Sequence, residues 1–174
     1  MFEMHPVGHV LNSRNEQEED CLSDNEACIR LVSQMGPDAL DGIEEFSHAL
    51  IIYYLDRVDP QRITRGSRHP LGNPAWPRVG IFAQYGANRP NRIATALVRI
   101  LRHEGTRLYV SGLDTHPHTA VLDIKPVMQG VLPQEGFRQP DWAGELLACG
   151  AGRQRLRPPA AERETSGSRP DGLA

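Results

Sequence analysis

The sequence FSHALIIYYL, residues Phe46–Leu55, contains the clearest strand signal in this 174-residue chain. It is almost continuously apolar and rich in the β-branched and aromatic side chains that are typical of strands. The charged pair Asp56-Arg57 ends the apolar run. A run of this length between polar residues predicts a strand that is buried in the core of a sheet.

Several short apolar segments on both sides of this run also predict strands. They are Val7–Leu11, Ala27–Ser33, Arg78–Ala83, Ile93–His103, Arg107–Leu113 and Ala120–Pro126. The spacing of apolar residues in Ile93–His103 also fits one face of a helix, but the short strands around it favour a strand. Gly36–Glu45 and Asp141–Ala148 predict short helices. We therefore expect a mainly β chain, folded as a small antiparallel β-barrel with short helices.

The polar segments predict loops and a tail. Asp59–Pro77 contains four prolines and two glycines, and a loop of this length is usually functional or mobile. Asn12–Glu26 is an acidic loop. From residue 151 onward the composition is typical of disorder. We expect one domain over residues 1–150 and a disordered tail over residues 151–174.

Several common classes of protein are excluded by missing patterns. The three cysteines, Cys21, Cys28 and Cys149, are odd in number and form no C-x-x-C pair, so we expect neither a disulfide framework nor a metal site. No G-x-G-x-x-G follows a strand, and no Walker, H-E-x-x-H or G-x-S-x-G motif is present. With no apolar run long enough for a membrane span and no signal pattern, we expect a soluble, cytoplasmic protein.

Charge is distributed unevenly along the chain. Ten arginines lie between Arg57 and Arg107, against only Asp59 and Glu104. Such asymmetry can indicate a surface that faces phosphate groups. It can equally reflect a general preference for arginine, because 18 of the 19 basic residues are arginine.

Gly80–Asn91, GIFAQYGANRPN, begins as an apolar strand and then breaks. Gly86 would permit an unusual backbone angle or the close approach of a ligand. Arg89 precedes Pro90 and is therefore expected to be extended. Asn91 can stabilise a turn or form hydrogen bonds with the edge of a base. A loop of this composition could hold a small polar ligand.

Five segments, in this order and spacing, carry a resemblance to a known family. They are Glu44-Glu45-Phe46-Ser47-His48, Arg78-Val79-Gly80-Ile81-Phe82-Ala83, Arg89-Pro90-Asn91, Ser111-Gly112-Leu113-Asp114 and Val121-Leu122-Asp123-Ile124-Lys125-Pro126. From about Val7 to Val127 the chain resembles the TsaA-like family, which includes the TrmO-type (YaeB-like) tRNA methyltransferases. The resemblance implies a small antiparallel β-barrel that forms a homodimer and binds S-adenosylmethionine near the dimer interface. It also implies N6-methylation of threonylcarbamoyl-adenosine in the anticodon loop of a tRNA.

The resemblance also implies which residues contact the cofactor. In a first segment they are Gln84, Tyr85, Gly86, Arg89, Pro90 and Asn91, and in a second segment Asp114, Thr115, His116 and Pro117. Asp56 and Arg57 form a third segment, and Thr95 and Ala96 lie on the strand that follows the first. For catalysis we expect Tyr85 to stack on the adenine or the sulfonium. Asp114, His116 or His118 could accept the proton that the acceptor nitrogen loses.

The chain departs from the family pattern at two places that matter for the acceptor. Where the family has Ala-Thr-Arg-Ser-Pro-Phe-Arg-Pro-Asn-Pro-Ile-Gly, this chain has Tyr85, Gly86 and Arg92 in place of the Arg, the Ser and the last Pro. The family's Asp-Gly-Thr-Pro turn is here Pro117-His118-Thr119-Ala120. The C-terminal domain of longer members has no counterpart. A small-molecule acceptor, or a non-catalytic cofactor-binding module, therefore remains an alternative to tRNA.

Other polar and aromatic residues have a structural interpretation. We expect His48 to be a hydrogen-bonded core residue, and Tyr53 and Tyr54 to pack on opposite sides of the barrel. We expect Asp123 and Lys125 to form an ion pair, and Trp142 to dock the last helix on the barrel. If they are not functional, His116 and His118 are expected to be turn residues.

Overall fold

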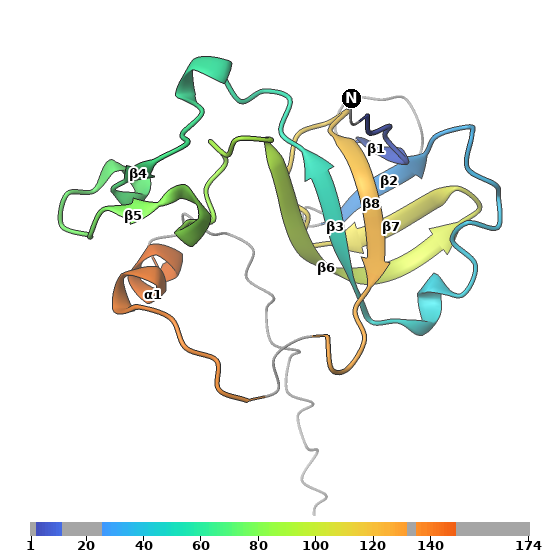
Figure 1. Ribbon diagram of the computed structural model, residues 1–174. Coiled ribbons are helices and arrows are strands. Elements are labelled where there is room, and N and C mark those ends of the chain that lie inside the picture. The colour runs from blue at the N-terminus through green and yellow to red at the C-terminus, as the bar shows by residue number, and fades with distance from the viewer. Residues whose placement is uncertain (1–2, 12–25, 132–134, 149–174) are drawn as a thin grey trace, which may run out of the picture.

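A closed antiparallel barrel is the main body of the computed structural model, which describes residues 3–11, 26–131 and 135–148. Its six strands lie in the order β1-β2-β7-β6-β3-β8 (Figure 1). Their bounds are β1 Gly8–Leu11, β2 Glu26–Leu31, β3 His48–Tyr54, β6 Ile93–Glu104, β7 Arg107–Ser111 and β8 Ala120–Pro126. Closure removes the free edges of the sheet. The predicted mainly β barrel is confirmed.

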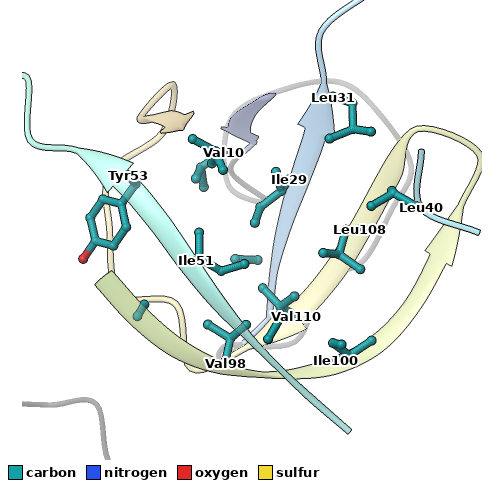
Figure 2. Close-up of a cluster of buried hydrophobic side chains, with 14 residues drawn as sticks. Val10, Ile29, Leu31, Leu40, Ile51, Tyr53, Val98, Ile100, Leu108 and Val110 are labelled. Atoms are coloured by element: carbon teal, nitrogen blue, oxygen red, sulfur yellow. The ribbon is translucent and has the colours of Figure 1, made fainter. Parts of the chain in front are cut away.

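The core lies inside the barrel because alternate side chains of each strand point inward. In β3, Ala49, Ile51 and Tyr53 are buried, and the residues between them face outward. In Figure 2 the side chain of Ile51 lies among those of Ile29, Val98 and Val110, with Tyr53 at one side of the cluster. The prediction that Tyr53 and Tyr54 lie on opposite sides is confirmed.

The strand assigned to Ile93–His103 is also confirmed, because β6 extends from Ile93 to Glu104. This strand pairs with β3 along its first half and with β7 along its second half. The register shifts between Ile100 and Arg102. A bulge of this kind increases the local bend of a strand, which helps a sheet of few strands to close.

Two predicted elements differ in the structure. Arg78–Ala83 was expected to be a strand, but only Val79–Gly80 (β5) is one, and it pairs with Ser67–Arg68 (β4). A 3-10 turn, η4 Ile81–Ala83, follows because the backbone N–H of Gln84 donates to the carbonyl oxygen of Ile81 at 3.2 Å. Within Gly36–Glu45, only η1 Ile43–Glu45 is helical. Its preceding residue, Gly42, has φ 81°, which interrupts a regular helix.

Residues 56–92, here called the excursion, leave the barrel after β3 and return at β6. They include the turns η2 Pro60–Arg62 and η3 Pro70–Gly72 besides β4, β5 and η4. In Figure 1 the excursion lies to one side of the barrel, with the helix α1, Asp141–Ala148, below it. The indole N–H of Trp76 donates to Glu145 Oε2 at 2.7 Å. The helix is thus attached to the excursion, and its expected docking on the barrel through Trp142 was wrong.

Some predictions concern residues outside the described ranges. These predictions are the acidic loop up to residue 25, the thiols Cys21 and Cys149, and the tail over residues 151–174. The remaining cysteine, Cys28, is a buried free thiol. In the described parts of the chain, no helix is long and apolar enough to cross a membrane, and no group of three or more His, Cys, Asp or Glu residues could hold a metal ion.

Candidate active site at the end of the barrel

A pocket of about 210 Å³ lies where the chain leaves β3 for the excursion. Its lining comes from three segments that are far apart in sequence. These residues are Leu55, Asp56, Arg57 and Val58 after β3, Ala87 before β6, and His116 and Thr119 before β8. Of the predicted cofactor contacts, the pocket contains Asp56, Arg57 and His116. The predicted cofactor loop contributes only Ala87, which was not among the predicted contacts.

A tight turn after β3 forms the first wall of the pocket. The backbone N–H of Leu55 donates to the carbonyl oxygen of Arg92 at 2.8 Å, and that of Val58 donates to Leu55 at 3.3 Å. Asp56 and Arg57 are exposed on this turn. The wall therefore combines an apolar part with two charged side chains of opposite sign.

Arg89 shapes the second wall from within the loop. Its Nη1 donates to the carbonyl oxygens of Gln84 at 2.6 Å and Ile81 at 3.4 Å. Its guanidinium carbon lies 5.9 Å from the ring centroid of Phe82. The Arg89 side chain thus closes residues 81–89 on themselves and holds Ala87 at the pocket.

Gln84 anchors the same loop to the β4–β5 pair. Its buried side-chain amide donates to the carbonyl oxygens of Val79 at 2.9 Å and Arg68 at 3.1 Å, and accepts from Arg68 Nε at 3.3 Å. A Cβ at Gly86 would lie 3.2 Å from Arg68 Nη2. Of the two possibilities considered for Gly86, its φ is not positive, and the close neighbour is the side chain of Arg68.

Tyr85 lies on the outer surface of the barrel. Its hydroxyl donates to the carbonyl oxygen of Thr95 at 3.3 Å and forms a second hydrogen bond with Thr95 Oγ1. The residue is 76% exposed. Ala96, the neighbour of Thr95, is fully buried in the core and has no surface to offer a ligand, so its predicted cofactor contact is corrected.

The third wall is the loop between β7 and β8. Asp114 and His116 are exposed, whereas Thr115 and Pro117 are half-buried. Thr115 Oγ1 and Thr119 Oγ1 are hydrogen-bonded at 3.0 Å, and the backbone N–H of Thr119 donates to His116 at 3.3 Å. These bonds hold His116 beside the pocket.

The two departures from the family pattern have opposite effects on the backbone. His118, at the glycine of the Asp-Gly-Thr-Pro turn, has φ 63°, a left-handed angle that glycine adopts freely and histidine more readily than most residues. Arg92, at the family's last proline, has φ 52°, which proline cannot adopt because its ring holds φ near −65°. A glycine could therefore adopt the angle seen at His118, whereas a proline could not adopt the angle seen at Arg92. Pro90 is half-buried and Asn91 is exposed beside it.

Tyr53, which the sequence assigned to packing, belongs to the core cluster and lies near the end of β3 that leads to the pocket. In Figure 2 its hydroxyl points away from the centre of the core cluster. Burial chiefly, and then the charges of Tyr85 and Asp114, raise the pKa of Tyr53 above its ordinary value. The three residues therefore share one end of the barrel. An inward tyrosine next to the end of a predicted strand was the signal available in the sequence.

The predicted ion pair Asp123–Lys125 and the predicted core position of His48 have different outcomes. The ion pair of Asp123 and Lys125 is confirmed, with Oδ2 and Nζ 2.7 Å apart. His48 is half-buried rather than in the core, and its Nδ1 is hydrogen-bonded to Ser47 Oγ at 2.8 Å. It lies at the start of β3, whereas the pocket lies beyond the end of that strand.

The sequence is similar to one known protein family over most of its length. The sequence profile of the tRNA-methyltransferase O N-terminal domain matches residues 15–131. The chain belongs to this family. A human relative, named tRNA (adenine(37)-N6)-methyltransferase, is 32% identical over 129 residues, which are 70% of this chain and 29% of that protein. An Archaeoglobus fulgidus relative, named probable S-adenosyl-L-methionine-binding protein, is 36% identical over 89 residues, 51% of this chain and 23% of its own length.

Solved structures of the TrmO family share the fold. The crystal structure of TrmO from Pseudomonas aeruginosa superposes with a TM-score of 0.55 at 22% identity, covering 80% of this chain and 64% of that chain. The chain spans less than a third of the human and Archaeoglobus relatives.

Proposed function

We propose that this TrmO-family chain is a methyltransferase that uses S-adenosylmethionine. The observation that carries the proposal is the pocket to which Asp56, Ala87 and His116 contribute from three separate segments. Relatives named for S-adenosyl-L-methionine binding or for tRNA methylation support it. A bound ligand requires a site of this kind, to which distant segments contribute side chains, whereas packing of the barrel does not require one.

The pocket residues fit such a cofactor chemically. The carboxylate of Asp56 can pair with the ammonium or sulfonium group of the cofactor, and the guanidinium of Arg57 can pair with the carboxylate of the cofactor. Leu55 and Val58 offer an apolar surface. The volume of about 210 Å³ is below the roughly 300–1,000 Å³ of complete small-molecule sites, so these residues would form one part of a larger site.

When bound, this cofactor supplies a methyl group that is already activated by the positive sulfur. The chain's task is then to orient the acceptor and to exclude water. Asp114, His116 and His118 lie on the loop that forms the third wall, and any of them could accept the proton that an amine acceptor loses. Tyr53, with its raised pKa, stays protonated at neutral pH and can donate a hydrogen bond.

For the acceptor we propose N6 of threonylcarbamoyl-adenosine in the anticodon loop of a tRNA, which would place the protein in the cytoplasm. The similarity to the human tRNA (adenine(37)-N6)-methyltransferase supports an adenine N6 acceptor in tRNA. Exposed arginines of the excursion, Arg57, Arg62, Arg65 and Arg78, could contact phosphates. One observation favours a small-molecule acceptor instead: the backbone at Arg92 differs from the conformation that the family's proline imposes.

We also propose a homodimer. The outer face of β3 and β6 presents the half-buried apolar residues Leu50, Ile52 and Leu97. A second copy against this face could complete the small pocket. Sedimentation equilibrium would measure the molecular mass, and a monomer at micromolar concentration would contradict this part of the proposal.

Calorimetry with S-adenosylmethionine and S-adenosylhomocysteine, followed by methyl transfer to tRNA that lacks the modification, tests the function. The wild-type chain should bind both ligands and methylate the tRNA. Asp56→Asn should weaken binding of the sulfonium ligand, whereas the matched control Asp41→Asn, on an exposed turn before η1, should not. Cofactor binding without tRNA methylation would favour the small-molecule acceptor. Absence of binding would leave a non-catalytic module.

A further inference from the structure

Two large aromatic side chains are exposed on one short loop. Phe82 is 79% exposed and Tyr85 is 76% exposed, three residues apart. Exposed aromatic residues that cluster in this way are characteristic of a binding surface. The loop beneath them is fixed by Arg89 and Gln84, as described above, so both rings are presented from a well-anchored backbone.

Neither ring belongs to the pocket. The loop contributes only Ala87 to the pocket lining, and the Tyr85 hydroxyl is bound to Thr95 on the outer side of β6. The ring of Tyr85 is therefore held at one end, while its faces remain accessible to solvent. Such a ring can take a flat partner at small cost in conformational entropy, because its orientation is already restricted.

The excursion that carries the two rings is rich in arginine, and two of its arginines lie near the loop: Arg89 beside the ring of Phe82 and Arg68 beside Gly86. Residues 56–92 contain seven arginines and only two acidic residues, Asp56 and Asp59. Aromatic rings on which bases stack, next to basic side chains that contact phosphates, are how proteins bind single-stranded nucleic acid. Of the possible partners, the charge favours an unpaired stretch of RNA over an apolar protein surface.

We propose that Phe82 and Tyr85 stack on unpaired bases of an RNA acceptor while the arginines of the excursion contact its phosphates. The inference rests on the proposed function in taking the acceptor to be RNA. It assigns Tyr85 to the acceptor, in contrast to the cofactor contact expected from the resemblance.

Fluorescence anisotropy with a labelled RNA hairpin that has an unpaired, adenine-containing loop tests this assignment. Phe82→Ala and Tyr85→Ala should each weaken binding of the hairpin by about 5- to 150-fold, the effect of losing one stacked base. Tyr85→Phe, which keeps the ring, should bind nearly as well as wild type. Phe137→Ala is the matched control, because Phe137 is also 76% exposed but lies on the segment before α1.

Calorimetry with S-adenosylhomocysteine on the same variants separates the two proposals. We expect its affinity to stay within about twofold of wild type in every variant, since neither ring lines the pocket. A loss of this affinity in Tyr85→Ala would place the ring in the cofactor site and overturn the inference. A wild-type chain that binds neither ligand would instead overturn the proposed function.

A second readout uses the unmodified protein. Hairpins with 5-iodouridine in the loop should crosslink under ultraviolet light to Phe82 or Tyr85, as located by mass spectrometry. Crosslinks only to other residues, or hairpin affinities in both alanine variants equal to wild type, would overturn the inference and leave the proposed function standing. A change from dimer to monomer in those variants, with RNA affinity retained, would identify the rings as a contact between two copies.

Discussion

Arg92 determines the backbone at the entry to β6 and, through it, one wall of the pocket. Its carbonyl oxygen accepts the N–H of Leu55, and its own N–H donates to Arg89 at 3.1 Å. Its guanidinium carbon lies 4.7 Å from the ring centroid of Tyr54. A single residue with φ 52° therefore connects the loop before β6 to the turn after β3.

Replacing Arg92 by proline, the residue of the family pattern, should destabilise this chain. Proline cannot adopt φ 52° and lacks the N–H that Arg89 accepts, so we expect a loss of about 2–3 kcal/mol in the free energy of unfolding. Urea unfolding would measure it. Arg92→Gly is the control, since glycine accepts this φ, and it should cost less than about 1 kcal/mol. Equal losses for the two variants would contradict the argument.

Tyr53 should make stability depend on pH in the alkaline range. Burial raises its pKa in the folded state above the unfolded value of about 10. As pH rises past 10, the unfolded chain loses the phenolic proton first, so the free energy of unfolding decreases. Urea unfolding at several pH values between 9 and 11 should show a steeper decrease for wild type than for Tyr53→Phe. Parallel curves would mean that this hydroxyl is not buried as described.

At the scale of elements, the excursion buries Pro70, Trp76 and Ile81 apart from the barrel core and otherwise depends on a few side-chain contacts. Its sheet has only the two-residue strands β4 and β5. Gln84 connects them to the loop that carries Tyr85, and Trp76 connects them to α1. Because few contacts support it, this part of the chain should unfold more readily than the barrel.

Gln84→Leu should loosen the excursion. The substitution removes the donor to the carbonyl oxygens of Arg68 and Val79 and leaves buried polar groups without partners, at about 1–3 kcal/mol for each. Hydrogen exchange should become faster at the backbone N–H of Gln84 and Ile81, while the barrel strands stay protected. Gln61→Leu, at an exposed position of η2, serves as control. Unchanged exchange in Gln84→Leu would refute the anchoring role.

Glu145→Ala should release α1 from the excursion. The buried residue Trp76 would lose the acceptor of its indole N–H, at a cost of about 1 kcal/mol or more. We expect faster proteolysis between residues 135 and 148 and a change in tryptophan emission. Glu135→Ala, which removes an exposed carboxylate at the start of the same region, should leave both unchanged. Equal proteolysis of the two variants would argue against the attachment.

At the scale of the whole molecule, positive charge is concentrated in residues 56–92, although the net charge of the chain is −3. The arginine-rich excursion is therefore a local feature of one side of the structure (Figure 1). A local positive surface attracts a polyanion even when the whole protein is slightly acidic.

Binding of the RNA hairpin should weaken steeply with salt. Each phosphate contact that an arginine makes releases a counterion, so Arg62→Gln and Arg65→Gln should each reduce the slope of log affinity against log salt by about 0.7 to 0.9. Arg30→Gln, exposed on β2, should not change the slope. A slope that is identical in all three variants and wild type would place the phosphate contacts elsewhere.

The sequence by itself determined the strands of the barrel and the family. Strand signals are local, because apolar residues that alternate or run together reflect burial of that same segment. That is why β3, β6 and β8 agree with the predicted ranges and why the resemblance is confirmed. The strand signal was misleading at Ile81–Ala83, where Ile81 is buried by a turn instead of a sheet partner and Phe82 is exposed.

Only the tertiary structure decided which side chains of the candidate site are available to a ligand. The side chains of Gln84 and Arg89 bind their own loop, Ala96 faces the core, and Tyr53 joins Tyr85 and Asp114 at the end of the barrel. These assignments depend on distances between segments that are far apart in the chain, and such distances leave no local pattern in the sequence. Asp56, Ala87 and His116 meet for the same reason: closing the barrel brings the ends of β3, β6 and β8 to one place.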